Sequence, residues 1–319
     1  MRSGAAAGHA GYFHETALYA SDEELLGVVV PFLRGGQEAG EPTLAVLAPG
    51  TAALARDGLG DTDGVTFVGG EAAYANPAQT IADYRARFAA LVARGATQIR
   101  VVGDVPHPGT GADWHAWARY EAAINHAYAD FPLWGLCPYD VRITPDDVLD
   151  DVLRTHPHIA SACGAHRPNA AFEDPRDFLA ARPLAPVDPL ERRDPDLEQV
   201  DPTPAAARRA IEALARRVLS QARLDDLLLA VSEIVANAGL HGRAPVVLRA
   251  RRGADRVVVS VADAGPGPAD PFAGLLAQPV GARPHGAGMG LWIAHLLCTD
   301  VALRREAHGF TVRLTMAAG

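Results

Sequence analysis

Several features that would place a chain in a common class at once are scarce or missing here. The 319 residues include only three cysteines, an odd number with no closely spaced pair: Cys137, Cys163 and Cys298. We therefore expect reduced thiols in the cytoplasm rather than a disulfide framework. Residues 1–9 hold one arginine and no long apolar run, so no signal peptide is expected. No stretch approaches the roughly 20 apolar residues of a membrane span, so we expect no association with a membrane.

An excess of positive charge is also missing. The chain carries 29 Lys and Arg residues against 38 Asp and Glu residues, which gives a formal net charge of −9. This balance gives no reason to expect direct binding to DNA or RNA, whose phosphate backbone attracts basic surfaces. Apolar residues make up 49% of the sequence, and the length suits about two domains, each able to bury a sizeable core.

The first half alternates between helical and extended patterns. A capping signal at Ser21 and an Asn76-Pro77 pair each open a helix. Short apolar strands are expected at residues 43–47, 64–68, 98–102 and 133–137. This alternation favours a layered α/β domain with a largely parallel sheet. The half lacks a Gly-x-x-x-x-Gly-Lys-Ser/Thr run, so we expect no P-loop and no ATP turnover there.

Polar residues at the ends of these strands are candidates for a ligand pocket. Asp104 and the Tyr139-Asp140 pair follow strands at their carboxyl ends, where open α/β sheets bind ligands, and His14 could join them. Carboxylates at strand ends also commonly cap helices or close turns. The pattern therefore leaves open both a pocket for a small-molecule signal and a purely structural role.

Four residues of the types that bind zinc fall within eleven positions: His156, His158, Cys163 and His166. Their spacing matches no zinc template, and the stretch lies where a helix gives way to a linker. We favour a tail packed on the domain surface over a metal site.

Prolines and charges become dense in the middle of the chain. Six prolines interrupt any long helix there: Pro183, Pro186, Pro189, Pro195, Pro202 and Pro204. We expect a first domain at residues 1–166, a semi-rigid linker at 167–203 that can partly pack on a domain, and a second domain at 204–319. An amphipathic helix with arginines on its wetter sides should begin near Ala205.

The second half contains three short motifs in a fixed order. The first runs from Glu233 to His241 inside an apolar helical pattern, and Glu233 and Asn237 are four residues apart, on one stripe of the helix. Asn237 is a candidate ligand of Mg²⁺, and Glu233, one turn away, is placed to accept a proton from an attacking hydroxyl or water. The alternative is an ordinary amphipathic helix with a solvated polar edge.

The second motif, Asp263-Ala264-Gly265-Pro266-Gly267, directly follows a strand-like run. Asp263 can accept a hydrogen bond from the exocyclic amino group of adenine, which guanine lacks at that position. Gly265 and Gly267 let a flat ring approach the backbone closely. The alternative is a hairpin turn, for which Asp and Gly are the usual residues.

The third motif places Gly286, Gly288 and Gly290 at alternate positions directly before an apolar helix. Free backbone N–H groups and the helix dipole at such a start suit phosphate groups. The alternative is a flexible loop that leads into a helix.

In this order and spacing the three motifs resemble the N, G1 and G2 boxes of the GHKL ATPase and kinase superfamily, over residues 204–316. The resemblance implies a GHKL-type α/β sandwich, a mixed sheet layered on helices with ATP between them. It also implies roles for three residues. Glu233 would be the general base, Asn237 the Mg²⁺ ligand and Asp263 the residue that recognises adenine.

The same resemblance implies further contacts with the nucleotide. Five glycines would line it: Gly265, Gly267, Gly286, Gly288 and Gly290. Thr311, in the closing strand, would help to bind the adenine region, and Arg283 and His285 in the lid are candidates for phosphate contact.

Within this superfamily the chain resembles the anti-sigma-factor serine kinases. Residues 205–222 contain no histidine, which argues against a histidine kinase, and no large transducer domain is expected after the ATP domain. The resemblance implies a regulator that holds a sigma factor inactive and phosphorylates Ser or Thr of a STAS-type anti-anti-sigma antagonist, with ATP and Mg²⁺ as cofactors. Such proteins are often homodimers. The alternative from another class is a non-catalytic, ATP-gated switch that sequesters a partner.

The first half resembles the MEDS sensory domain. Its matching segments are His14-Glu15, Leu18-Tyr19, Ser21 to Glu24, Gly40 to Pro42, Cys137 to Asp140 and Thr155 to Pro157. This resemblance implies a RecA-like layered α/β fold that senses a signal. A less favoured alternative is an enzyme that acts on a small metabolite.

Overall fold

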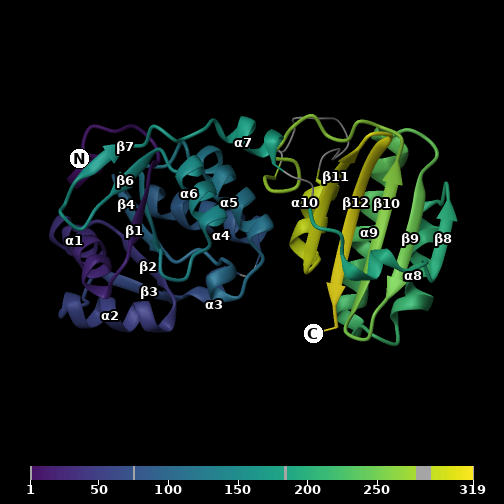
Figure 1. Ribbon diagram of the computed structural model, residues 1–319, viewed down its shortest axis with the longest axis horizontal. Helices are drawn as coiled ribbons and strands as arrows, with labels where there is room; N and C mark the ends of the chain where they lie inside the picture. The colour runs from purple at the N-terminus through teal and green to yellow at the C-terminus, as the bar shows by residue number, and fades with distance from the viewer. Residues whose placement is uncertain (1, 75, 183–184, 278–288, 319) are drawn as a thin grey trace. The chain divides into compact units, whose positions relative to one another are not determined.

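The computed structural model describes residues 2–74, 76–182, 185–277 and 289–318, with residues 71 and 72 described by their backbone alone. The chain divides into two compact units, Met1–Ala181 and Arg182–Gly319 (Figure 1). Each unit has its own sheet and its own helices. Among the described residues, no helix combines the length and the apolar character that a bilayer crossing requires.

The first unit is built on a seven-stranded sheet in the order β3-β2-β4-β5-β1-β6-β7. Its strands are β1 (Phe13–Tyr19), β2 (Thr43–Leu47), β3 (Val65–Gly69), β4 (Ile99–Gly103), β5 (Leu133–Asp140), β6 (His158–Ala160) and β7 (His166–Pro168). Neighbouring strands run parallel except in the antiparallel pair β6 and β7. The predicted layered α/β fold with a largely parallel sheet is confirmed.

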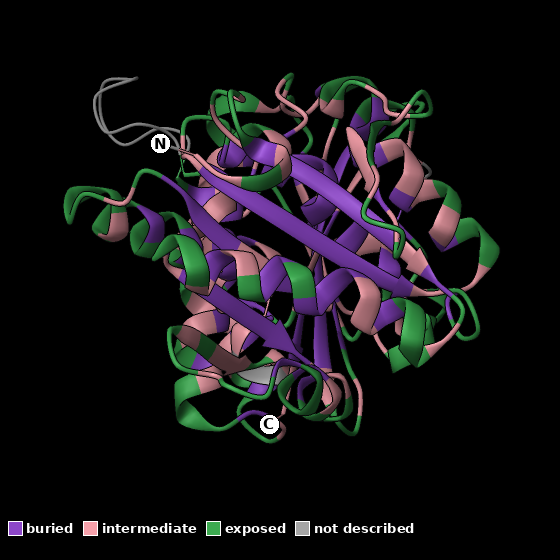
Figure 2. Cartoon of the chain, turned by 90° about the vertical axis from the view of Figure 1, so that its left-hand side faces the viewer, coloured by how far each residue is buried: buried purple, intermediate pink, exposed green. Residues whose placement is uncertain are grey.

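The strand β1 was not among the expected strands, although it lies inside the sheet between β5 and β6. Its sequence mixes His14, Glu15 and Thr16 with apolar residues, so it does not show the continuous apolar run that is typical of a buried strand. All three polar side chains are buried, with exposed fractions of 0%. The inner strands β1, β2, β4 and β5 are buried over most of their length, whereas the edge strands β3 and β7 are half-buried or exposed. The helices in front of the sheet are exposed on their outer sides (Figure 2).

Helices cover both faces of this sheet. They are α1 (Asp22–Ala39), α2 (Pro49–Leu59), α3 (Gly70–Ala73), α4 (Pro77–Ala93), α5 (Trp114–Ala127), α6 (Asp146–Thr155) and α7 (Pro175–Ala181). As expected, the side chains of Ser21 and Asn76 accept hydrogen bonds from the backbone N–H groups of Glu24 and Gln79, and so cap α1 and α4. Helices α1 and α2 pack on the face that carries Phe13 and Trp134, and α4 and α5 pack on the opposite face (Figure 1).

Strand alternation divides the polar residues of β1 and β5 between these two faces. His14 and Thr16 pair with Gly135 and Cys137, so His14 and Cys137 point to the face of α4 and α5. Glu15 points to the opposite face, toward α1. Two separate polar sites therefore lie on the two sides of the same strand pair.

The second unit has a five-stranded antiparallel sheet in the order β11-β12-β10-β9-β8. Its strands are β8 (Leu197–Val200), β9 (Val247–Arg252), β10 (Arg256–Asp263), β11 (Asp300–Glu306) and β12 (Gly309–Ala317). Three helices, α8 (Pro204–Ala215), α9 (Gln221–His241) and α10 (Gly290–Leu297), form a layer on one face of this sheet (Figure 1). This is the α/β sandwich that the motifs implied.

The stretch expected to be a linker, residues 167–203, contributes elements to both units. Helix α7 belongs to the first unit, and β8 pairs with β9 in the second. Residues 186–192 lie against the sheet of the second unit, where Asp188 forms an ion pair with Arg256 at 3.0 Å and the carbonyl of Pro186 accepts a hydrogen bond from Arg313. Pro186 and Pro189 therefore lie in a short segment that packs on this sheet.

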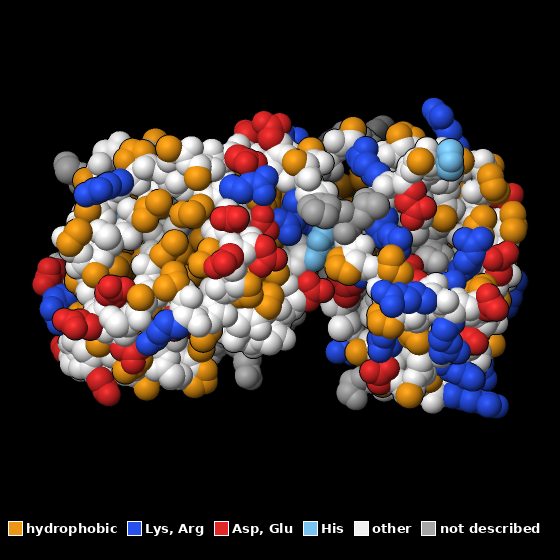
Figure 3. Space-filling view, viewed as in Figure 1, with side chains coloured by type: hydrophobic (Ala, Val, Ile, Leu, Met, Phe, Trp, Pro, Cys, Tyr) orange, Lys and Arg blue, Asp and Glu red, His pale blue; other side chains and the backbone are white. Residues whose placement is uncertain are grey.

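Basic side chains are frequent on the visible face of the second unit (Figure 3). Four exposed arginines belong to α8 and the turn after it: Arg208, Arg209, Arg216 and Arg217. They lie on the wetter sides of the amphipathic helix, as its sequence indicated.

Candidate functional site

The first motif lies on α9, the central helix of the second unit. Ser220 caps this helix, and its apolar side packs into the core between the helices and the sheet through Leu227, Val231 and Ile234. Glu233 and Asn237 are half-buried on a different side of the same helix. Their spacing of one turn places the carboxylate and the amide next to each other, as the sequence predicted.

The start of α10 lies directly against these two side chains. A β-carbon built at Gly290 would lie 2.7 Å from Nδ2 of Asn237 and 2.8 Å from Oε2 of Glu233. At these distances a β-carbon would force the ends of both side chains to shift. The glycine therefore lets the backbone of a helix start come into contact with a carboxylate and an amide, which joins the first motif to the last glycine of the third.

Asp263, the last residue of β10, ties two loops together. Its Oδ1 accepts hydrogen bonds from the backbone N–H groups of Gly265 at 2.6 Å and Arg243 at 3.1 Å. The carbonyl of Arg243 in turn accepts a hydrogen bond from Ala264 at 2.8 Å. A β-carbon at Gly242 would lie 2.4 Å from Cγ of Asp263. The second motif is thus held against the end of α9, on the side of the sheet that carries the helices.

Gly267 provides a second close approach. Its φ angle is +71°, in the left-handed region that favours glycine. A β-carbon there would lie 2.4 Å from Cδ2 of Phe310. The loop after Asp263 therefore runs directly over the ring of Phe310. This ring lies beside Asp263 because the two residues are register partners in β10 and β12.

The register is at odds with the role expected for Thr311. Thr311 is the partner of Ala262, and the side chains of facing residues in an antiparallel pair point to the same face. Asp263 and Phe310 point to the face of α9, so Thr311 points to the opposite face. The contact of Thr311 with the adenine region came from the family resemblance, and it remains a prediction that this register does not favour. The apolar residues Phe310, Val312 and Leu314 alternate along the strand and so indicate its buried face. This pattern could have shown that Phe310, which the sequence analysis missed, lies on the same face as Asp263.

Four of the predicted nucleotide contacts, Arg283, His285, Gly286 and Gly288, lie outside the described residues. Of the glycines in the third motif, the structure places Gly290 alone. The described part of the site therefore consists of α9, the end of β10 with its loop, β12 and the first turn of α10.

In the first unit, two of the residues expected at a sensory pocket come together around a third. The hydroxyl of Tyr139 donates a hydrogen bond to Oε1 of Glu121 at 2.6 Å, and Nε2 of His14 lies 3.6 Å from Oε2 of the same carboxylate. Burial raises the pKa of Glu121 to about 7. Sequence reasoning missed Glu121, although a lone carboxylate among the apolar positions of the helix at residues 114–127 was a signal for it.

The other two residues of the expected pocket have local roles. Oδ2 of Asp104 accepts a hydrogen bond from the backbone N–H of Ala48 at 2.9 Å, at the start of α2, and burial raises the pKa of Asp104 to about 6. Asp140 accepts hydrogen bonds from Arg142, and these hold its pKa below its ordinary value. Both contacts are of the capping and turn kind that remained the alternative for these carboxylates.

The four residues considered as zinc ligands do not converge on one point. His156 is fully buried, with an exposed fraction of 0%, whereas Cys163 is exposed. The ring of His158 stacks on Phe13 at 4.1 Å between centroids, and Nδ1 of His166 lies 2.8 Å from Oε2 of Glu15. The four side chains thus contact different parts of the first unit.

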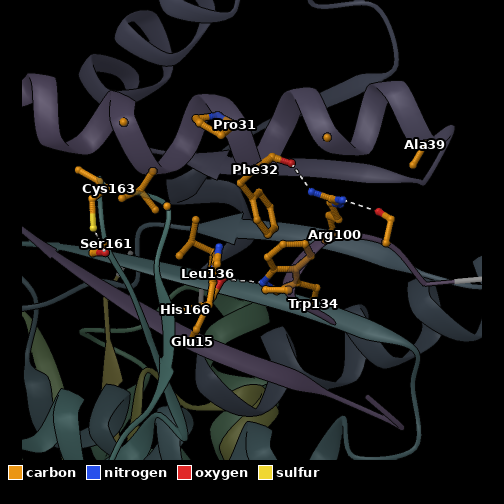
Figure 4. A pocket seen from close by; sticks show the side chains of 18 of the residues that line it. Glu15, Pro31, Phe32, Ala39, Arg100, Trp134, Leu136, Ser161, Cys163 and His166 are labelled. Atoms are coloured by element: carbon orange, nitrogen blue, oxygen red, sulfur yellow. Dashed lines mark hydrogen bonds and ion pairs between the residues drawn. The ribbon is translucent and has the colours of Figure 1, made fainter. Parts of the chain in front are cut away.

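A cavity of about 750 Å³ lies on the α1 side of the same sheet, between α1 and the β6–β7 hairpin (Figure 4). The guanidinium of Arg100 lies 4.5 Å from the ring centre of Trp134 and forms an ion pair with Glu41 at 2.7 Å. Buried Glu15 accepts a hydrogen bond from Nε1 of Trp134 at 2.6 Å and raises the pKa of His166. The volume of the cavity and its mixed apolar and charged lining are typical of a small-molecule pocket.

Comparison with known families identifies both units. Residues 13–157 match the sequence model of the MEDS family, the MEthanogen/methylotroph, DcmR Sensory domain. Residues 196–316 match that of the histidine kinase-like ATPase domain. The chain therefore consists of a MEDS domain followed by a histidine kinase-like ATPase domain, as the motifs predicted. No curated protein matches the chain.

Two solved structures show weak likenesses. The RsbU and RsbW domains of Rv1364c from Mycobacterium tuberculosis are 23% identical, with a TM-score of 0.28, over 38% of this chain and 31% of that chain. The Acinetobacter baumannii histidine kinase AdeS is 11% identical, with a TM-score of 0.24, over 39% of this chain and 68% of that chain. The match thus spans less than a third of the length of the first structure. At these values neither likeness carries an argument about activity or partners.

Proposed function

We propose that the second unit binds Mg-ATP and acts as an anti-sigma serine/threonine kinase, under the control of a signal that the MEDS domain senses. The observation that supports this most strongly is the convergence of Glu233, Asn237 and the backbone of Gly290. A carboxylate, an amide and the free N–H groups of a helix start are the groups that phosphoryl transfer requires in one place.

Each part of the site has a chemical role in this proposal. Asp263 uses Oδ1 for two backbone N–H groups, and we assign Oδ2 to the amino group of adenine. Gly265 and Gly267 admit the base beside Phe310. Asn237 would supply one protein ligand to Mg²⁺. This ion takes its other ligands from waters and phosphate oxygens, and when bound it would neutralise phosphate charge.

The proposed phosphoryl transfer forms one bond and breaks one bond, and Glu233 accepts the proton that is released. The hydroxyl oxygen of a serine or threonine on the partner attacks the γ-phosphorus, and the bond from that phosphorus to the β–γ bridging oxygen breaks. ADP leaves, and the hydroxyl proton passes to the carboxylate of Glu233. The backbone at Gly290, directly beside Glu233, would hold the phosphoryl oxygens.

We propose a sigma factor and a STAS-domain antagonist as the partners of this unit, in the cytoplasm. The site itself supports the nucleotide and the transfer of its phosphoryl group. The partners rest on the resemblance of the motifs to those of anti-sigma serine kinases.

A non-catalytic, ATP-gated switch is the second candidate. The contact between Glu233 and the position of Gly290 favours it, because a carboxylate packed against a helix start can also act by positioning that helix. In this case nucleotide binding would change the affinity for a partner without transfer of phosphate.

Glu233→Gln separates the two candidates. The substitution keeps the size of the side chain and removes its basicity, so a kinase should bind ATP within about threefold of wild type yet lose at least about 100-fold in phosphate transfer to a STAS protein. Glu212→Gln, at an exposed ion pair on α8, is the matched control. Transfer that survives in Glu233→Gln would contradict the role of Glu233 as general base and would favour the switch.

A further inference from the structure

A buried group of four potential metal ligands lies in the first unit, away from the cavity beside α1. It consists of His14 on β1, Glu121 on α5, Cys137 on β5 and His156 directly after α6. In the first half of the chain, the sequence suggested possible metal ligands only at His156, His158, Cys163 and His166. Two of the four, His14 and His156, are 142 positions apart in the chain, so no local spacing could have indicated this group.

The ligand atoms of the group are close together. Nε2 of His14 and Nε2 of His156 each lie 3.6 Å from Oε2 of Glu121. Sγ of Cys137 lies 3.6 Å from Nε2 of His14. All four ligand atoms are within 4.8 Å of one another, and the four side chains are buried.

Hydrogen bonds fix which nitrogen of each imidazole faces the group. Nδ1 of His156 lies 2.7 Å from the carbonyl of Val152, which can only accept, so Nδ1 carries the proton. Nδ1 of His14 lies 3.0 Å from Oδ1 of Asn125. The amide of Asn125 is held in this orientation because its Nδ2 donates to backbone carbonyls, including that of Thr155 at 2.8 Å. Both Nε2 atoms therefore direct a lone pair at Glu121.

This arrangement has few donors at its centre. The thiol of Cys137 can donate to His14, and the hydroxyl of Tyr139 donates to Oε1 of Glu121. Nε2 of His156 and Oε2 of Glu121 are buried and have no hydrogen-bond partner among the described residues. Two buried acceptors that face each other without a donor are unfavourable unless a proton or a metal ion lies between them.

We propose that His14, Glu121, Cys137 and His156 bind one divalent transition-metal ion of the zinc class. Two imidazole nitrogens, one thiolate and one carboxylate oxygen form a donor set suited to Zn²⁺ in four-coordinate geometry. Ligand atoms placed tetrahedrally at about 2.0–2.3 Å from a metal are about 3.3–3.8 Å apart. Three of the six separations are 3.6 Å and fall within this range, and the other three are no longer than 4.8 Å.

The surroundings of the group also fit a metal site. Histidines that bind metals usually donate their other ring N–H to a carbonyl or carboxylate, as His156 does to Val152 and His14 to the side-chain amide of Asn125. The donor from Tyr139 holds the second oxygen of Glu121. A metal here would link two central strands of the sheet to α5 and α6, and so would stabilise the whole MEDS domain.

The proposal is independent of the nucleotide site, and spectroscopy on the intact protein tests it. The protein is unfolded with a chelator and refolded with one equivalent of Co²⁺, which substitutes for Zn²⁺ and is coloured. We expect a thiolate-to-cobalt absorption band and the strong visible bands of a tetrahedral site. We also expect about one zinc per chain by elemental analysis after refolding with Zn²⁺.

Variants then assign the ligands. Cys137→Ser should abolish the thiolate band, and His156→Gln should weaken Zn²⁺ binding by at least about tenfold. Cys163→Ser and His158→Gln, which replace the same residue types outside the group, should leave both properties unchanged.

Three results would overturn the proposal. If neither ion binds the wild-type protein, a proton on Glu121 in place of a metal holds the group together. If cobalt binds without a thiolate band, or if the two control variants abolish binding, the metal lies elsewhere. The wild-type spectrum decides the first question even if a variant in the group fails to fold.

Discussion

At the scale of single residues, the site in the second unit depends on positions that must remain small. Gly290 and Gly267 have no room for a β-carbon, since the nearest atoms belong to Asn237 in one case and Phe310 in the other. These glycines act by letting the backbone approach functional side chains. Flexibility does not explain why they are required.

Gly290→Ala should therefore weaken ATP binding without unfolding the protein. The added methyl group would displace Glu233 and Asn237, and we expect at least a tenfold loss of affinity, or about 1.4 kcal/mol. Gly239→Ala is the matched control, because it lies on the same helix as these two residues and its β-carbon would meet no atom within 4 Å. Equal affinities for the two variants in a fluorescent-nucleotide titration would contradict the packing described here.

Asp104 gives a prediction about pH. Its pKa is raised from 3.8 to about 6 by burial, so the folded protein binds this proton more tightly than the unfolded chain does. The contribution of Asp104 to stability is complete below about 3.8 and is lost as the pH rises through about 6. Asp104→Asn keeps an oxygen that can accept from Ala48, and should raise the unfolding temperature by a few degrees, roughly, at pH 8.

Asp140→Asn is the control of opposite sign. Its pKa is lowered by Arg142, so its stabilising effect is present at neutral pH and is lost only in acid. This variant should therefore lower the unfolding temperature at pH 8. If Asp104→Asn also lowers it there, burial of the Asp104 carboxylate is not unfavourable, and the reasoning from its pKa is wrong.

At the scale of helices and strands, the register of β10 and β12 decides which residues can reach a nucleotide. It places Phe310 beside Asp263 and turns Thr311 to the opposite face. Thr311→Val should therefore change ATP affinity by less than about threefold, since it removes one hydroxyl on the face of the sheet opposite to Asp263.

Phe310→Ala should have a larger effect on two measurements. Phe310 is buried in the core of the second unit, and its removal should destabilise the protein by about 3 kcal/mol in denaturant unfolding. It should also weaken ATP binding, because the loop at Gly267 rests on its ring. A large loss of affinity in Thr311→Val, with none in Phe310→Ala, would show that the register argument fails.

The same elements show how far sequence alone could predict this protein. Periodicity and capping signals predicted the layered α/β fold and most of its helices, because those signals are local. The strand β1 was missed because His14, Glu15 and Thr16 are buried by contacts with distant residues. Such contacts cannot be predicted from a short window of sequence.

The candidate sites follow the same rule. Glu233 and Asn237 could be paired from their spacing on one helix, and the structure adds that Gly290 meets them. The group around Glu121 draws on four elements that are distant in the chain, so no motif could have indicated it. For Thr311, the resemblance indicated a position in the closing strand, whereas the face of the strand on which it lies follows only from the register.

At the scale of the whole molecule, the chain divides into two units, with the boundary between residues 181 and 182. The segment before α8 is part of the second unit, since β8 pairs with β9 and Asp188 forms an ion pair with Arg256. A second domain that begins at residue 204 would lose one strand of its sheet and the segment that covers buried arginines.

Two fragments test this boundary. Residues 182–319 should unfold cooperatively and bind ATP, whereas residues 204–319 should unfold at a temperature at least several degrees lower, because β9 becomes an edge strand. Calorimetric scans of both fragments make the comparison. Equal unfolding temperatures would mean that residues 182–203 behave as a linker.

The measurement that tests the central claim most directly is Mg-ATP binding to the intact protein by titration calorimetry, with Asp263→Asn and Asn237→Ala beside wild type. Asp255→Asn, at the opposite end of β10 and 75% exposed, is the matched control. We expect one site per chain in wild type and in the control, and at least a tenfold loss of affinity in the other two variants, about 1.4 kcal/mol. Binding that Asp263→Asn and Asn237→Ala leave unchanged, or no binding by wild type and by residues 182–319, would contradict the account.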